Sequence, residues 1–167
     1  MQLPANLKDF NIYVNGTNFL GRAKDFKPPQ IKVETESERY AGMDGKVKHD
    51  MGMEEMDAKL KMGELSKELA SLVGSIEEVP ITMYGYAEVS PGGQSTEIVL
   101  TMRGRLMEQD IGDIASGKKT DIDFNMSLTA YKEVIGGTTT KDIDVLAIRR
   151  IIGGKDVLAA KRSALKA

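Results

Sequence analysis

Apolar and polar residues alternate along most of the chain, and this alternation predicts β-strands. The longest regular stretch covers residues 120–133, where every second residue from Ile122 to Ala130 is apolar and the residues between are polar. A period of two places the two sets on opposite faces of one strand, so one face is buried and the other is wet. This stretch is longer than the usual strand of roughly five or six residues.

The same pattern marks shorter strands elsewhere in the chain. They cover residues 10–14, 31–35, 56–62, 81–89, 98–106 and 140–145. Asn15-Gly16 and Gly136-Gly137 are predicted turns, because such pairs admit positive φ; the first would lead into a returning strand over 17–23. Short turns and half-wet strands predict mainly antiparallel β-structure, a sandwich or small barrel, in one domain over residues 1–167.

Residues 64–74 have a different period. Leu65, Leu69, Leu72 and Val73 recur at helical spacing, and Gly74 stands where a helix would end. We therefore predict one flanking α-helix over about 64–74, with its leucine stripe packed into the core. A short terminal helix over 156–165, capped by its first residue, is also consistent with the sequence.

A glycine-punctuated polar segment precedes the strand at 56–62, and it carries several methionines. Flexible, unbranched methionines on a projecting segment suit a surface that packs against another chain. We predict an extended hairpin arm over about 38–56; an ordinary surface hairpin with scattered apolar residues is the alternative. The apolar residues predicted to contact other subunits are Tyr40, Met43, Val47, Met51 and Met53.

Composition excludes most chemistry. The net charge of −2 does not suit a protein that grips nucleic acid. The chain has no cysteine, and His49 is its one histidine, so no thiol nucleophile, Cys–zinc site or histidine-based triad can be assembled. No apolar run approaches the roughly 20 residues that span a bilayer, and the N-terminus lacks the pattern of a signal peptide. We expect a protein that is not an enzyme and needs no cofactor or metal.

Two charged clusters remain as candidate sites. Asp121 and Asp123 share one strand face, where a cation site is possible but a solvated face is the commoner arrangement. Arg103 and Arg105 also share a face, and the acids that follow them (Glu108, Asp110 and Asp113) favour a salt-bridged interface over a phosphate site.

The length of the strands itself indicates assembly. A long strand at a sheet edge is a template for aggregation unless that edge is paired or blunted. A ring of subunits, each pairing its edge with the next, has no free edges.

Several segments, in the right order along the whole chain, resemble the major tail tube protein of contractile-tailed phages and R-type tailocins. They are Leu7–Gly21, Tyr40–Gly45 with His49–Glu54, the Met-Arg-Gly-Arg strand and Glu-x-Asp-x-Gly loop within Leu100–Asp113, Asp142–Asp144, and Ile152–Leu158. The chain departs from the pattern at Gly153, where Asn is commoner, and in the methionine-rich arm.

This resemblance implies a β-sandwich or barrel assembled as hexameric rings that stack into a hollow tube, with four strands of each subunit lining the channel. It also implies a virion tail or tailocin particle, made in the bacterial cytoplasm. The tube's partners would be further copies of itself, a contractile sheath, a tape-measure protein, and baseplate and terminator proteins. DNA would pass through the lumen without specific binding in a phage, whereas a tailocin would only perforate the target envelope.

Channel-facing residues follow as a hypothesis, since neutral or acidic side chains repel phosphates. The residues are Asp121, Asp123, Asn125, Ser127, Glu55 and Asp57. The subunit and ring interface would contain the apolar arm residues together with Arg103 and Arg105. Two alternatives stay open. A monomeric ligand-binding β-barrel would need an apolar interior pocket, and a secretion-system tube protein of related fold would lack the Met-Arg-Gly-Arg and terminal motifs.

Overall fold

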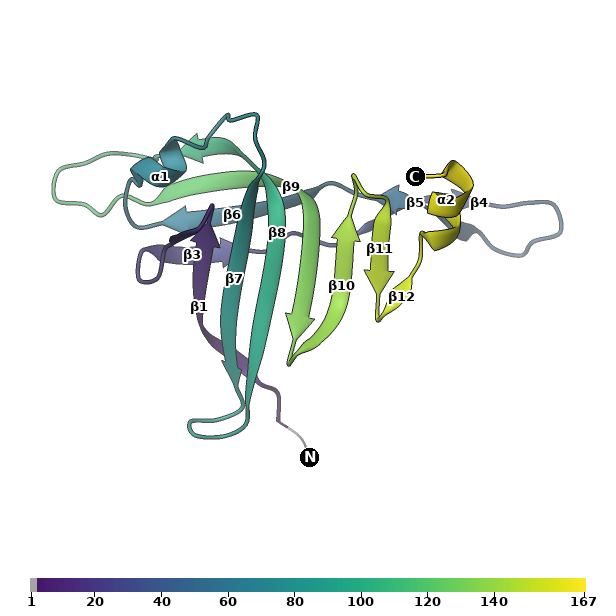
Figure 1. Cartoon of the computed structure of the whole chain (residues 1–167), viewed down its shortest axis with the longest axis horizontal. Helices are drawn as coiled ribbons and strands as arrows, with labels where there is room; N and C mark the ends of the chain where they lie inside the picture. The colour runs from purple at the N-terminus through teal and green to yellow at the C-terminus, as the bar shows by residue number, and fades with distance from the viewer. Residues whose placement is uncertain (1–2) are drawn as a thin grey trace.

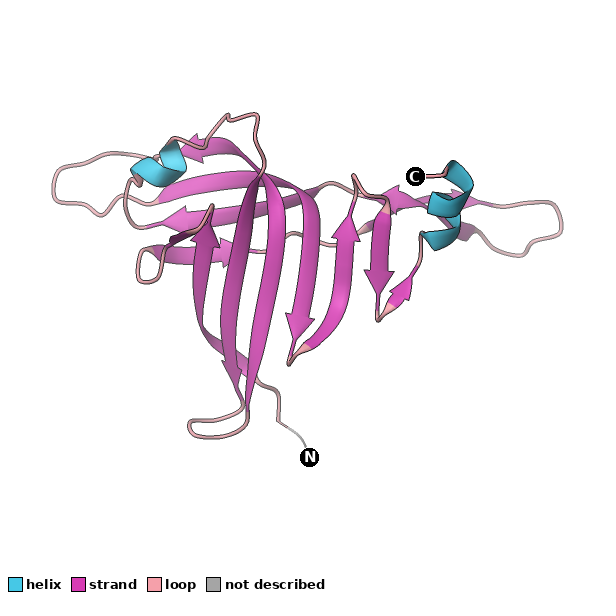
Figure 2. Cartoon of the chain, viewed as in Figure 1, coloured by secondary structure: helices cyan, strands magenta, loops and turns pink. Residues whose placement is uncertain are grey.

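The computed structural model describes residues 3–167 and folds them mainly into antiparallel strands (Figures 1 and 2). One sheet has the order β12-β11-β10-β9-β8-β7-β1-β2, and β6 pairs with both β9 and β3. Its strands are β1 (Asn6–Val14), β2 (Thr17–Asn18), β3 (Ala23–Lys27), β6 (Met56–Met62), β7 (Val79–Glu88), β8 (Ser95–Asp110), β9 (Ile122–Ile135), β10 (Thr138–Asp144), β11 (Arg149–Ile152) and β12 (Lys155–Asp156). The prediction of mainly antiparallel β-structure is confirmed.

Strand β9 belongs to two half-sheets. It pairs with β8 along one edge, whereas its other edge pairs with β6 over residues 122–128 and with β10 over residues 130–135. We call β3, β6, the first part of β9 and the last part of β8 (residues 105–110) the four-stranded half-sheet. The remaining strands form the large half-sheet. In Figure 1, β3 and β6 run across the direction of β1, β7 and β10, so the two half-sheets are strongly rotated against each other.

A β-bulge in β9 separates its two parts. Gly104 pairs with Leu128 and Arg103 pairs with Ala130, which leaves Thr129 without an opposite residue. One extra residue reverses the alternation, so Tyr131 is buried at 3% exposure. The unbroken alternation in the sequence predicts Tyr131 on the polar face, and that prediction is wrong because of the bulge.

The hydrophobic core collects the apolar faces of both half-sheets. Its largest fully buried side chains come from strands of both, and from the segments between them: Ile12, Val14, Phe19, Leu60, Met62, Leu69, Ile81, Leu106, Ile122, Phe124, Met126 and Ile143. The even-numbered residues of β9 up to Leu128 are buried, as their alternation predicts.

The first hairpin is only partly as expected. Asn15 and Gly16 form the predicted turn, with φ of 49° and 80°. The returning strand over 17–23 is wrong, because the chain pairs only briefly in β2 and then turns at Phe19. The Phe19 ring is buried, its N–H donates to the carbonyl of Ile12, and its carbonyl accepts from Arg22.

The helices are shorter than predicted. Helix α1 covers only Lys67–Ala70. Ser66 fixes its start by accepting a hydrogen bond from the N–H of Leu69, and the chain continues as a turn from Ser71. Leu65 therefore lies before the helix, and its side chain is 60% exposed. Helix α2 covers Ala159–Leu165 and begins after the proposed cap Asp156, whose carboxylate accepts from the N–H of Leu158. Within residues 3–167, no helix is long and apolar enough to cross a membrane.

The arm is a two-stranded sheet of its own, formed by β4 (Val33–Glu38) and β5 (Val47–Met53). It projects from the body at the side where β11 and α2 lie (Figure 1). Its base begins earlier than the predicted 38–56, because β4 pairs with β5 along its whole length. The residues from Met56 onward belong instead to β6 in the body, so the predicted strand at 56–62 is confirmed.

Candidate functional site

Two edges of the four-stranded half-sheet are open. β3 pairs with β6 on one side, and within residues 3–167 its other side pairs with no strand. On the opposite side, β7 pairs with β8 only as far as Gly104, so in the described part of the chain no strand pairs with this edge of β8 over residues 105–110. The Leu106 carbonyl accepts a hydrogen bond from the Gly74 N–H at 3.0 Å, and this loop contact covers only the start of that edge. The edge of β1 is also largely open, but it belongs to the large half-sheet.

The exposed side of the four-stranded half-sheet is a polar face, whose residues the strand register places in three rows. The rows are Lys27–Lys59–Asn125–Glu108, Asp25–Lys61–Asp123–Asp110 and Asp57–Ser127–Arg105. Five acids and four bases give this face a formal charge of −5 + 4 = −1. The polar face is therefore mixed in sign and nearly neutral.

Contacts within the polar face provide partners for two of its acids. The Nζ atom of Lys59 lies 3.2 Å from Oδ2 of Asp123, and the Nδ2 of Asn125 donates to Oε2 of Glu108 at 2.6 Å. At the rim, Asp121 pairs with Lys24, and this hydrogen bond lowers the pKa of the Asp121 carboxyl. In the part of the chain that the structure describes, no three His, Asp or Glu side chains form a group that could hold a metal ion.

The structure gathers most of the predicted channel-facing residues on the polar face. Asp57, Asp123, Asn125 and Ser127 lie on adjacent strands in register. Asp121 precedes β9 at the rim, and Glu55 precedes β6 near the base of the arm, where it lines a groove with Glu34 and Met53.

The lysines of this face were missing from the predicted set. Lys59 and Lys61 share the alternation of Asp57 in β6, so the sequence pattern already places them on the same face. Lys27 stands opposite Lys59 only because β3 pairs with β6, and no local pattern reveals that pairing.

The two arginines of the Met-Arg-Gly-Arg strand have different surroundings. Arg103 donates to Glu78 at 2.9 Å and to the buried Asp144 at 3.1 Å. These partners are internal, and they are not the nearby acids that the sequence suggests. Arg105 stands opposite Ser127 on the polar face. Arg103 is thus satisfied within its own chain, whereas Arg105 is available at the open part of β8.

Most of the predicted interface residues of the arm are exposed. Tyr40, Val47 and Met51 are 58%, 44% and 56% exposed, and Met43 is half-buried beside Tyr40. Met53 differs, because it lies at the base of the arm and packs against the core. The arm therefore exposes three large apolar side chains to solvent, and they lie among charged residues such as Glu36 and Lys48.

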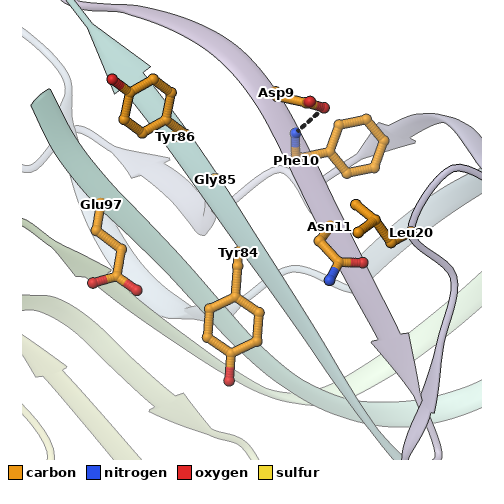
Figure 3. Close-up of a pocket in the computed structure, with 8 residues that line it drawn as sticks. All are labelled: Asp9, Phe10, Asn11, Leu20, Tyr84, Gly85, Tyr86 and Glu97. Atoms are coloured by element: carbon orange, nitrogen blue, oxygen red, sulfur yellow. Dashed lines mark hydrogen bonds between the residues drawn. The ribbon is translucent and has the colours of Figure 1, made fainter.

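A groove lies on the large half-sheet beside the edge of β1 (Figure 3). It has a volume of about 420 Å³ and is lined by Asp9, Phe10, Asn11, Leu20, Tyr84, Gly85, Tyr86 and Glu97. Tyr84 also makes an edge-to-face contact with Tyr13 at 5.9 Å between ring centroids. The ligand-binding alternative requires an apolar pocket inside the barrel, whereas this groove lies on the surface and the interior is filled by the core side chains.

Solved structures with the same fold come from contractile injection systems. The chain is similar to a protein of the sheath–tube complex of an extracellular contractile injection system, PVC, in its extended state, with a TM-score of 0.58 and 11% identity over 79% of this chain and 90% of that one. It is equally similar to a protein of the six-fold symmetrised baseplate of the anti-feeding prophage, with a TM-score of 0.58 and 12% identity over 83% and 99% of the two chains.

Proteins of similar sequence identify the family of the chain within this fold. The chain is 27% identical to the tail tube protein of Escherichia phage P2, over 97% of both chains. It is 32% identical to the major tail tube protein of Serratia phage KSP20, over 87% of this chain and 86% of the relative. The family model for phage tail tube protein FII matches residues 4–165. The chain therefore belongs to the phage tail tube protein FII family and is a structural subunit of a tail tube.

Proposed function

We propose that six copies of the chain form a ring by joining their four-stranded half-sheets edge to edge, and that rings stack into a hollow tube. The observation that carries this proposal is the pair of open edges, β3 on one side and residues 105–110 of β8 on the other. If β3 of one copy pairs with β8 of the next, both edges are satisfied and the ring closes. The six-fold symmetry of the anti-feeding prophage baseplate supports the number six.

The size of such a barrel suits a channel. Six copies with four strands each give roughly 24 strands, and at about 4.8 Å between strands and a tilt of about 40° the barrel is roughly 50 Å across between backbones. Side chains reduce this diameter, yet the remaining space admits a DNA double helix. One copy alone contributes too few strands to close a barrel of any kind.

The polar face is the side that lines the channel in this arrangement. Its opposite side carries the buried residues of β6 and β9, which pack into the core, so only the polar face can be wet. Asp57, Asp123, Asn125 and Ser127 would face the lumen, with Asp121 and Glu55 at its rims. A nearly neutral, mixed lining does not hold phosphates, because it offers no block of bases to replace the counterions of DNA. DNA passes without specific binding in a phage, and a tailocin tube perforates the target envelope.

The arm supplies contacts between subunits and between rings. Tyr40, Met43, Val47 and Met51 form its apolar surface, and exposed apolar patches on a projecting hairpin mark protein contacts. Arg105, at the open part of β8, adds a polar contact at the ring seam.

The tube's partners follow from its place in the virion tail or tailocin particle. A sheath surrounds the tube, as the sheath–tube complex with the same fold supports. A baseplate and a terminator hold its two ends, and a tape-measure protein occupies its lumen during assembly. This role needs no catalytic group.

Negative-stain microscopy of the purified, concentrated protein tests the proposal. The expected result is annuli or hollow filaments whose class averages have six-fold symmetry. A protein that remains monomeric at every concentration, with no annuli in the images, would rule out closure through the open edges.

A further inference from the structure

The arm is joined to the body by few contacts. Its two strands form a separate sheet, and the Glu54 N–H donates to the Lys32 carbonyl at 2.9 Å to close its base. A two-stranded hairpin on its own is marginally stable in water, and nothing within it fixes its orientation relative to the body. Met53 packs against the core at the base of the arm, and farther out Arg150 of β11 reaches the arm from the body.

The Arg150 guanidinium contacts the arm through two of its nitrogen atoms. Its Nη2 donates to Oδ2 of Asp50 at 2.6 Å, and its Nη1 lies 3.4 Å from Oδ1 of the same carboxylate. The Nη1 atom also lies 3.5 Å from the sulfur of Met53. Arg150 is only 6% exposed, although Asp50 on the arm is largely exposed. A planar guanidinium that binds both carboxylate oxygens fixes orientation as well as distance.

The same carboxylate fixes a bend in the arm. Oδ1 of Asp50 accepts a hydrogen bond from the Gly52 N–H at 2.9 Å, and Gly52 has φ of 123°. Glu34 pairs with Gly52 and Thr35 pairs with Asp50, so Met51 is an extra, bulged residue. A bulge bends its strand and increases its twist, and glycine is the residue that tolerates this backbone region. The arm therefore bends at the point where the body holds it.

We infer that Arg150 is a positioning residue that sets the direction of the arm through Asp50 and the bulge at Met51-Gly52. The consequence for assembly rests on the function proposed above, in which the arm contacts neighbouring copies. An arm whose direction is already fixed loses less conformational entropy on binding than a mobile one. The Arg150–Asp50 contact therefore favours tube formation without touching another subunit.

The test uses variants that separate the junction from the fold. Arg150→Gln removes the guanidinium of the ion pair between the body and the arm. Asp50→Asn removes the carboxylate charge of the same ion pair and keeps an acceptor for the Gly52 N–H. The matched control is Arg149→Gln, which removes a neighbouring ion pair with Asp142 within the body. Because the chain has no cysteine, Asp44→Cys carries a single spin label near the tip of the arm, at an exposed residue outside the predicted contact residues.

The expected result is a more mobile label in the Arg150 and Asp50 variants and an unchanged label in the Arg149 variant. Amide exchange in residues 47–53 should quicken by roughly tenfold to a hundredfold, as expected when hydrogen bonds to charged groups are lost. Exchange in β8 and β9 should stay slow, which shows that the body is folded. An unchanged label and unchanged exchange in the Asp50→Asn variant would overturn the inference.

Tube formation by the same variants distinguishes the two proposals. Loss of tubes in parallel with increased arm mobility supports both. A mobile arm with normal tubes supports the positioning role of Arg150 and rejects the claim that a fixed arm direction favours assembly.

Discussion

At the residue scale, Gly104 is the position where the fold depends most on the absence of a side chain. A Cβ atom there would lie 2.2 Å from the Ser127 carbonyl oxygen and 2.8 Å from the Leu128 Cα. The backbone of β9 approaches so closely because of the bulge at Thr129 next to it. A glycine inside a strand is a sequence signal for such a bulge, and it is the one local sign that the alternation of β9 would break.

We predict that Gly104→Ala destabilises the subunit by about 1–3 kcal/mol, because backbone atoms must move to accept the methyl group. Denaturant unfolding measures this loss. Gly85→Ala is the matched control on the neighbouring strand β7, where the added Cβ would meet the movable tip of the Leu7 side chain. Equal losses in the two variants would contradict this account.

A second prediction concerns the partly buried side chain of Glu133 and the loss of stability in acid. Burial alone would raise the pKa of Glu133, but hydrogen bonds from Thr140, Lys141 and Tyr131 outweigh it and hold this pKa below the ordinary 4.5. A lowered pKa in the folded state stabilises the fold above the ordinary value, and the benefit is lost as the pH falls through the folded value.

Unfolding free energies measured between neutral and acid pH should therefore fall less steeply for Glu133→Gln than for the natural chain. Asp50, Glu68, Asp121 and Asp156 also have lowered pKa values, and the difference between the two chains removes their common contribution. Identical pH slopes would show that Glu133 does not contribute.

At the element scale, regular alternation locates strands well, whereas elements that tertiary contacts shape are poorly predicted from the sequence. The pattern of β6, β7 and β9 locates these strands within a few residues, and Asn15-Gly16 locates the first turn. The strand expected over 17–23 is absent because the Phe19 ring is buried in the core. The helix expected over 64–74 begins only after its cap at Ser66. The burial of Phe19 has no local signature, because it depends on what the ring meets in the folded chain. Serine is a preferred N-cap residue, so the start of the helix after Ser66 does have a local signal.

The arm gives a prediction at this scale. Replacement of residues 39–46 by an Asn-Gly turn joins β4 directly to β5 and removes the exposed tip. We expect an unchanged unfolding midpoint, because the tip does not enter the core, together with loss of tubes in negative stain. Replacement of the exposed loop at 90–94 by the same Asn-Gly turn is the control. Normal tubes from the tip variant would exclude the arm from assembly.

At the scale of the whole molecule, the polar face was predictable in its alternation and unpredictable in its charge. Asp57 and Asp123 are recognisable as wet residues from their own strands. Lys59 and Lys61 share the alternation of Asp57, whereas Lys27 joins them only because β3 pairs with β6, which sequence alone does not reveal. The neutral or acidic face expected from the predicted residues is therefore a mixed one, and the open edges that bound it become visible only in the folded chain.

Disulfide capture tests those edges directly. Within one copy, β3 and the open part of β8 are separated by β6 and β9, so roughly 14 Å lies between them, too far for a disulfide. In a closed ring they are neighbours. Variants that pair Asp25→Cys with Glu108→Cys, or Lys27→Cys with Asp110→Cys, should give a ladder of linked copies after oxidation.

Single-cysteine variants are the control and should stop at dimers. Absence of a ladder from every pair, under conditions where the same protein forms tubes, would mean that the ring closes through other edges.

The charge of the polar face gives the last prediction. Asp57→Lys changes the polar face from −1 to −1 + 2 = +1 per copy. We expect normal tubes that retain DNA in a salt-dependent way, because added bases release counterions on contact with phosphates. Glu77→Lys makes the same change outside this face and should have no effect. Equal DNA release by both variants would mean that this face does not line the channel.

Because β9 belongs to both half-sheets, it also determines how the subunit would bear mechanical load. A push or pull on the outer body reaches the inner strands through the hydrogen bonds between β8 and β9, which run the length of both strands. Sliding one strand along the other strains many of these bonds together. The seams between copies are short by comparison, since β3 and the open part of β8 each span only a few residues. An overloaded tube should therefore fracture between subunits and release folded copies.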